Sequence, residues 1–146
     1  MTDFVNTIDL LGDDVVAAEF VSRTITEFND DELAKVGNYA FCNCKELVSA
    51  SLPNVSFVGE QAFNSCSKLN TISLPSVKDI RQYAFAFTSR LESVTLPATP
   101  PTIQTTSFYD TKSACVFHIP AGSLSAYQSA TNWSSLTGQY TFTEDA

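Results

Sequence analysis

The chain has 146 residues, of which 44% are hydrophobic and 16% are charged, so it suits one domain with a buried core rather than a disordered protein. The formal net charge of −8 arises within residues 1–33, where nine acidic residues accompany a single Arg, whereas residues 34–146 hold seven of each sign. No basic patch is present that would attract phosphates, which argues against nucleic-acid binding and a polybasic membrane contact. No apolar run is long enough for membrane insertion.

Residues 1–24 are expected to form a helical cap. Asp13 and Asp14 precede the apolar run 15–21, and acids are favourable where the helix dipole is positive. Residues 2–11, stopped by Gly12, favour another short helix. The first six residues lack the basic start and apolar stretch of a secretory signal. We therefore expect synthesis in the cytoplasm without Sec export, with a virion as the alternative location.

A 22-residue period runs through the middle of the chain. The dipeptide Ala-Phe recurs at 40–41, 62–63 and 84–85, and Leu recurs with the same step at 47, 69 and 91. A degenerate unit starts near Ile25, with Asp30 where Leu is expected. After the third unit the step is 23 residues, and the extra residue near Pro100-Pro101 predicts a bulge. We interpret residues 25–120 as a repeat region.

The repeat unit has a direct physical interpretation. Residues 50–52 alternate as a short strand requires, and Pro53 ends the strand because it cannot donate a ladder hydrogen bond. Segment 59–66 suits one helical or 3-10 turn with Ala62 and Phe63 inward. Each coil buries its apolar side chains only against its neighbours. The predicted fold class is an α/β repeat, a solenoid of about four to five coils with short strands and short helical turns.

Three units resemble the BspA-like subclass of bacterial leucine-rich repeats, whose pattern looks like I/V-G-x-x-A-F-x-x-C-x-x-L-x-x-V-x-L-P. These units are residues 36–47, 58–69 and 80–91. The third departs from the pattern, because Arg81 replaces Gly and Thr88 replaces Cys. The resemblance implies a leucine-rich-repeat solenoid with capped ends. The leader and repeats together are also similar to short leucine-rich-repeat proteins of phages and prophages of gut bacteria.

Residues 121–146 are expected to form a C-terminal cap, so that the cap, repeats and leader make a single domain. Segment 119–133 resembles the terminal cap of the same family. Ser123 is expected to N-cap a short helix that carries Leu124 and Tyr127 on one face. We expect Trp133 to cover the last coil and residues 139–142 to add a final strand.

The sequence offers little for catalysis, a metal or a cofactor. A nucleophilic pair of Cys115 and His118 is conceivable, but these positions on a strand point to opposite faces, so a surface histidine is favoured. Cys44 and Cys66 share a column one coil apart, which permits a disulfide, although two small buried side chains are the preferred interpretation. No nucleotide-binding, hydrolase or zinc motif occurs. We therefore predict no enzyme, no catalytic residues, no cofactor and no metal.

The outward strand positions form the candidate binding face. They are Ser49, Ser51, Thr71, Ser73, Ser93, Thr95, Val116 and His118. Solenoids bind through such surfaces, although small hydroxyl residues are also good exposed strand residues. The first hypothesis is a non-enzymatic module that binds a protein or a cell-surface glycan through this face or the acidic leader. The alternative is a phage virion component, such as a tail-associated, receptor-binding or decoration protein. The oligomeric state is not readable from the sequence.

Overall fold

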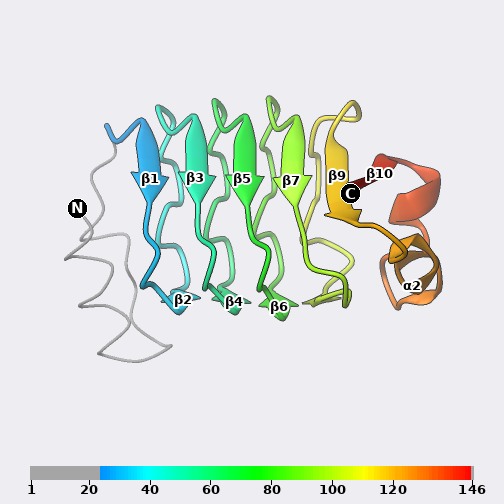
Figure 1. The fold of residues 1–146 in the computed structure, drawn as a ribbon. Helices are drawn as coiled ribbons and strands as arrows, with labels where there is room; N and C mark the ends of the chain where they lie inside the picture. Colours follow the sequence, from blue (N-terminus) through cyan, green and yellow to red (C-terminus); the bar gives the residue numbers. More distant parts are fainter. Residues whose placement is uncertain (1–23, 146) are drawn as a thin grey trace.

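The computed structural model describes residues 24–145, which form a parallel β-solenoid of about five turns with little helix (Figure 1). The first sheet has the order β1-β3-β5-β7-β9-β10, and the second has the order β2-β4-β6-β8. The first sheet comprises β1 (Glu27–Asn29), β3 (Ser49–Ser51), β5 (Thr71–Ser73), β7 (Ser93–Thr95), β9 (Val116–Pro120) and β10 (Thr141–Asp145). The second comprises β2 (Lys35–Val36), β4 (Phe57–Val58), β6 (Asp79–Ile80) and β8 (Thr102–Ile103). The expected N-terminal helical cap, apart from Thr24, lies outside the described residues.

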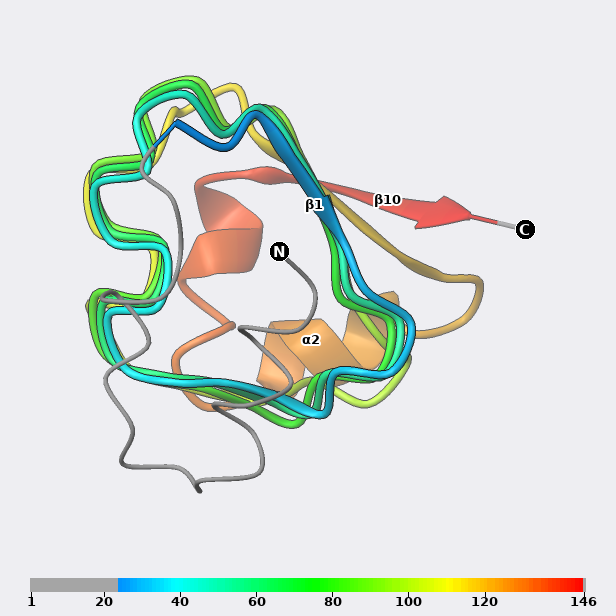
Figure 2. The ribbon, with the colours of Figure 1, turned by 90° about the vertical axis from the view of Figure 1, so that its left-hand side faces the viewer.

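The strand register confirms the repeat and its irregularities. Phe28, Ala50, Ile72 and Val94 are successive partners at the 22-residue step, so the predicted degenerate first coil is present. Val94 then pairs with Phe117, and Asp79 pairs with Thr102, each 23 residues on. The extra residue therefore lies between β7 and β8, close to Pro100-Pro101 as predicted. Seen along the stack, the coils superimpose closely (Figure 2).

The predicted helical or 3-10 turn at residues 59–66 is wrong. Gln61 and Ser65 have positive φ values of 53° and 61°, which interrupt any right-handed helix. The amides of residues 61, 63 and 65 donate to carbonyls of the next coil, whereas those of 62, 64 and 66 donate three residues back. The segment is therefore a chain of turns whose alternate amides join the coils. The fold is a β-solenoid instead of an α/β repeat, because within residues 24–145 the only helices follow the last coil.

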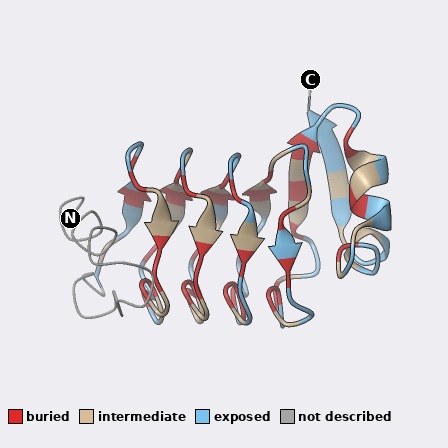
Figure 3. Cartoon of the chain, turned by 90° about the horizontal axis from the view of Figure 1, so that it is seen from below, coloured by how far each residue is buried: buried red, intermediate tan, exposed pale blue. Residues whose placement is uncertain are grey.

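The core is a column of aromatic rings surrounded by aliphatic columns. Phe41 stacks on Phe63 at 4.9 Å, Phe63 on Phe85 at 5.2 Å, and Phe85 on Phe108 at 5.3 Å between ring centroids. Phe28 packs against the first of these rings at 5.1 Å. Buried residues accordingly line the inside of every coil while exposed residues lie outside (Figure 3). Offset ring stacking adds to burial, so the column stabilises the contact between each pair of coils.

The C-terminal segment packs on the open side of the last coil. It contains α2 (Leu124–Ser129), the 3-10 helix η2 (Leu136–Gly138) and β10. Trp133 is fully buried, with ring centroids 5.7 Å from Phe117 and 5.8 Å from Phe108. The predicted final strand exists, but it spans Thr141–Asp145 instead of residues 139–142. The boundary of a C-terminal cap at residue 121 stays a prediction.

Side chains of this segment bind backbone carbonyls of the last coil, and the equivalents of two of them, Pro101 and Ile103, accept amides of the next coil elsewhere in the stack. Each donor reaches back about 30 residues to the last coil. The pairs are Tyr127 hydroxyl to Pro97, Asn132 amide to Ile103, Trp133 indole N–H to Pro101 and Tyr140 hydroxyl to Thr111, at 2.6 to 3.3 Å. Buried carbonyls without partners are costly, so these bonds stabilise the end of the stack.

Ser123 precedes α2 as predicted, but it does not cap the helix through its side chain. Its hydroxyl donates to the carbonyl of Pro120, so it has turned away from the helix amides. The Leu124 amide instead donates to Glu144 Oε2 at 3.1 Å. Glu144, which is distant in sequence, therefore accepts an amide at the start of α2, the role that the local pattern predicted for Ser123.

Candidate functional site

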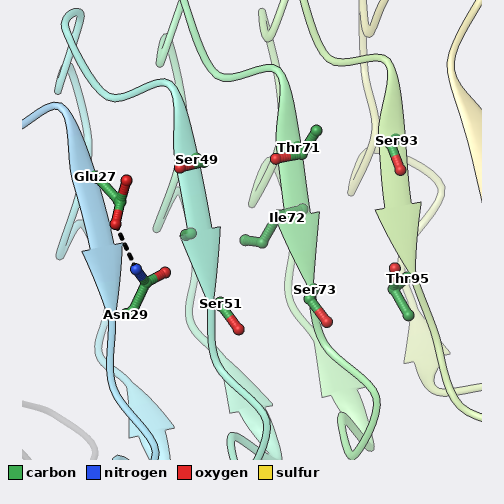
Figure 4. Close-up of a pocket in the computed structure, with 10 residues that line it drawn as sticks. Glu27, Asn29, Ser49, Ser51, Thr71, Ile72, Ser73, Ser93 and Thr95 are labelled. Carbon is green, nitrogen blue, oxygen red and sulfur yellow. Dashed lines mark hydrogen bonds between the residues drawn. The ribbon is translucent and has the colours of Figure 1, made fainter.

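The outward positions of the first sheet form two parallel rows of small polar side chains (Figure 4). One row contains Glu27, Ser49, Thr71 and Ser93, and the other contains Asn29, Ser51, Ser73 and Thr95. In each strand the residue between the two rows is buried, because successive side chains on a strand point to opposite faces. We call this surface the strand face. It encloses a shallow hollow of about 310 Å³.

Small hydroxyl side chains give the middle of the strand face its chemistry. No residue of β3, β5 or β7 is charged, and none is aromatic. A Ser or Thr hydroxyl donates one hydrogen bond and accepts others. Successive strands therefore offer hydrogen-bond donors and acceptors at a spacing of about 4.8 Å. The surface suits a polar partner that meets several rungs at once.

The sequence interpretation missed two members of the strand face. Glu27 and Asn29 continue the rows onto β1, and Asn29 Nδ2 donates to Glu27 Oε1 at 2.6 Å. A step of 22 residues back from Ser49 and Ser51 leads to these residues, so the signal was available in the repeat. They give the strand face an acidic end at β1.

The predicted Val116 and His118 lie beyond the hollow, on β9. The alternating burial of β9 places both on the outer side, and the His118 side chain is 31% exposed. His118 Nδ1 lies 3.2 Å from Asp145 Oδ2 on β10. This contact could not be predicted, because β10 lies outside the repeat and has no column from which its register could be inferred. The register of β9 with β7 places Val116 beside Ser93 and His118 beside Thr95, so these two residues continue the two rows beyond the hollow.

The conceivable Cys115–His118 pair has no geometric support. Cys115 is fully buried, whereas His118 is on the outer surface. Burial raises the pKa of the Cys115 thiol to about 12, while the charge of Lys112 acts weakly in the opposite direction. A thiol with this pKa is protonated at neutral pH and is a poor nucleophile. The arrangement favours a structural role for Cys115.

The shared cysteine column is part of the core. Cys44 and Cys66 are fully buried, as their interpretation as small buried side chains predicted. Cys66 Sγ donates to the carbonyl of Phe41 at 3.0 Å. In the same column, the Thr111 hydroxyl donates to the carbonyl of Phe85 in the preceding coil at 3.1 Å. The Thr88 hydroxyl donates to the same carbonyl, within its own coil, at 2.7 Å. The departure at Thr88 is therefore tolerated because its hydroxyl can also donate to a backbone carbonyl.

Within residues 24–145, no three His, Cys, Asp or Glu side chains gather in a way that could hold a metal ion. In the same described part of the chain, no helix combines the length and apolar character that membrane crossing requires.

Comparisons with known proteins agree with this geometry. A sequence profile described as "BspA type Leucine rich repeat region (6 copies)" matches residues 18–137. A crystal structure of a leucine-rich repeat protein from Bacteroides ovatus superposes with a TM-score of 0.54 at 23% identity. The superposition covers 65% of this chain and 30% of the Bacteroides chain, so this chain corresponds to less than a third of that protein and shares the fold alone. No curated protein matches the sequence.

Proposed function

Because the chain belongs to the BspA-type leucine-rich repeat family, which is typically non-catalytic, we propose that it is a non-enzymatic module that binds a protein through its strand face. The observation that carries the proposal is the double row of hydroxyls with no aromatic or charged residue on β3, β5 or β7. The fold requires only that these outward side chains be tolerated on a strand, yet Ser or Thr fills each of them.

A protein partner fits the strand face better than a glycan does. Sugar rings are usually held against an aromatic ring, and the ten residues that line the hollow contain none. Polar loops or an extended segment of a partner protein can instead form hydrogen bonds with successive hydroxyls of the strand face. Glu27 at one end favours a partner that carries a basic group there, because opposite charges guide association and set its register.

The first prediction concerns lysine substitutions on the strand face. Thr71→Lys, Ser93→Lys and Thr95→Lys introduce a long cation into the hollow and displace a bound partner. A photocrosslinker at position 71 identifies the partner in a lysate of the host cell, and calorimetry with the purified partner then measures affinity. We expect each substitution to weaken binding by about tenfold or more, equivalent to about 1.4 kcal/mol.

Ser76→Lys is the matched control, because Ser76 is exposed but does not line the strand face. It should bind like the unmodified chain. Equal affinity for all four variants would remove the strand face from consideration. An enzymatic activity that is lost in His118→Ala would argue against a non-enzymatic module. The virion role stays a prediction, and detection of the chain in purified phage particles by mass spectrometry would test it.

A further inference from the structure

Three aromatic side chains gather on neighbouring turn segments. These segments lie opposite the first sheet (Figure 2). Tyr83, Phe87 and Tyr109 belong to the last two complete turn segments. Phe87 and Tyr109 are 44% and 52% exposed, which makes them two of the three large exposed hydrophobic residues within the described part of the chain.

The repeat itself shows that the fold does not require these aromatics. Phe87 is equivalent to Asn43 and Ser65, and it has a positive φ of 59°, which a bulky residue rarely adopts. Tyr109 is equivalent to Ala86, Asn64 and Cys42. Smaller residues therefore serve the same backbone elsewhere, and the exposed Phe87 and Tyr109 gain little burial that would explain their size.

The three rings hold one another in a fixed arrangement. Tyr109 packs nearly perpendicular to Phe87 and to Tyr83, at centroid distances of 5.6 Å and 6.0 Å and interplanar angles of 77° and 72°. Edge-to-face contacts of this kind are favourable. The Phe87 amide also donates to the Tyr109 carbonyl at 3.0 Å, which joins the two turns. Tyr109 is therefore an exposed platform whose orientation is set before any ligand arrives, which lowers the entropy cost of binding.

Tyr109 borders a hollow of about 240 Å³ between the last turn segment and the C-terminal segment. Gln104, Asp110 and Gln139 also line it, and among the described residues their side-chain polar atoms have no hydrogen-bond partner. Asn132 uses its amide nitrogen on the Ile103 carbonyl at 2.8 Å, which leaves its amide oxygen as an acceptor. The hollow therefore combines an aromatic platform with several uncommitted donors and acceptors.

We propose that the Tyr109 hollow is a binding subsite for a neutral carbohydrate, separate from the strand face. A pyranose has an apolar face of C–H groups that can lie on Tyr109 and a rim of hydroxyls that can bond Gln104, Asp110 and Gln139. The lining contains no Lys, Arg or His, so an anionic ligand would meet only the charge of Asp110. The volume lies below the range of about 300–1,000 Å³ for drug-sized ligands, which suits one sugar unit at the end of a chain or branch.

A glycan array probed with the full chain tests the proposal, because multivalent display detects weak monosaccharide contacts. Saturation-transfer NMR then measures affinity for the methyl glycoside of the sugar shared by the array hits. We expect Tyr109→Ala and Phe87→Ser, which restores the residue of the second coil, to lower the affinity about tenfold. Gln104→Ala alters an exposed side chain with no structural bond and should lower it severalfold.

Tyr39→Gln is the control, since Tyr39 shares the column of Tyr83 but lies two coils away, and Gln occupies the equivalent position 61. Its affinity should equal that of the unmodified chain. Three results would overturn the proposal: no neutral glycan bound on the array, unchanged affinity in both Tyr109→Ala and Gln104→Ala, or a loss caused by Thr71→Lys on the strand face instead. Loss of the protein partner in the strand-face variants leaves this subsite intact, so the two proposals fail independently.

Discussion

Cys115 is a residue whose acid–base chemistry is dominated by burial. Its thiol lies within the last coil, and the desolvation raises its pKa to about 12 from an ordinary value of 9.0. Burial also raises the pKa values of Tyr127 and Tyr140 above their ordinary value of 10.0. All three groups lie where the C-terminal segment meets the last coil. The folded chain therefore holds these protons more tightly than the unfolded chain does.

This difference predicts a loss of stability in alkali. Below about pH 9 both states are protonated at Cys115, and the full stabilisation is present. As pH rises from about 9 to about 12, the unfolded thiol ionises first, so the free energy of unfolding falls. We expect Cys115 to account for a loss of about 1 kcal/mol by pH 10. Urea unfolding at pH 7, 9 and 10 measures the effect.

Cys115→Val supplies the control, because it keeps the buried volume similar and removes the proton. Its alkaline slope should be shallower than that of the unmodified chain, with the remainder due to the tyrosines. Identical slopes in the two proteins would contradict the assignment to Cys115.

At the scale of the elements, the strands of the first sheet from β1 to β9 could be predicted because each one repeats a column, whereas the two-residue strands of the second sheet were not predicted. The alternation around Ala50 and its equivalents fixed both the strand positions and their outward residues. The turn segments could not be predicted, because positive φ values at Gln61 and Ser65 have no glycine to mark them. Local composition there favours a helical turn, and the bonds to the next coil override it. The contact of His118 with Asp145 was equally hidden, since nothing in the sequence aligns β10 with β9.

Gly59 is a position at which two turn segments approach closely. A Cβ atom there would lie 2.6 Å from both the backbone nitrogen and Oδ1 of Asn38, and the same Oδ1 accepts the Glu60 amide at 2.8 Å. We expect Gly59→Ala to lower the free energy of unfolding by about 2 kcal/mol or more, because the backbone must shift to relieve the clash.

Gly138→Ala is the matched control, because a Cβ at Gly138 meets nothing within 4 Å. Its stability should be unchanged or slightly higher, since alanine restricts the unfolded chain. Chemical denaturation followed by circular dichroism compares the two variants. Equal denaturation midpoints for Gly59→Ala and Gly138→Ala would show that the two turn segments can move apart at Gly59 without loss of stability.

At the scale of the whole molecule, each inner coil of the stack is stabilised by a neighbouring coil on both sides. The last coil has a neighbouring coil on one side only, and the C-terminal segment packs on its other side. Side chains of Asn132 and Trp133 bind the carbonyls of Ile103 and Pro101, whose equivalents in earlier coils accept amides of the next coil. The sequence indicated that Trp133 would cover this end, but it could not indicate which carbonyls these side chains would meet, because that depends on the folded path of residues 121–140.

Trp133→Ala should weaken the entire stack. It removes a fully buried indole and leaves the Pro101 carbonyl without its donor, for an expected cost of about 3–5 kcal/mol. Because coils stabilise only their neighbours, we expect unfolding to begin at this end and to lose its two-state form. Hydrogen exchange should show amides of β9 exchanging before those of β3. Gln128→Ala, at an exposed position of α2, is the control and should leave exchange unchanged. A uniform increase in the amide exchange rates of all coils would contradict unfolding from the C-terminal end.

The register of β3, β5 and β7 also has a consequence for how this surface can evolve. Each unit begins and ends at equivalent backbone positions, with its bonds directed only to the units on either side. An in-frame duplication of one unit would therefore lengthen the sheet by about 4.8 Å and add two hydroxyl positions without altering either terminus. The number of repeat units encoded by the gene would then set the length of the strand face and match it to the size of the partner's contact surface.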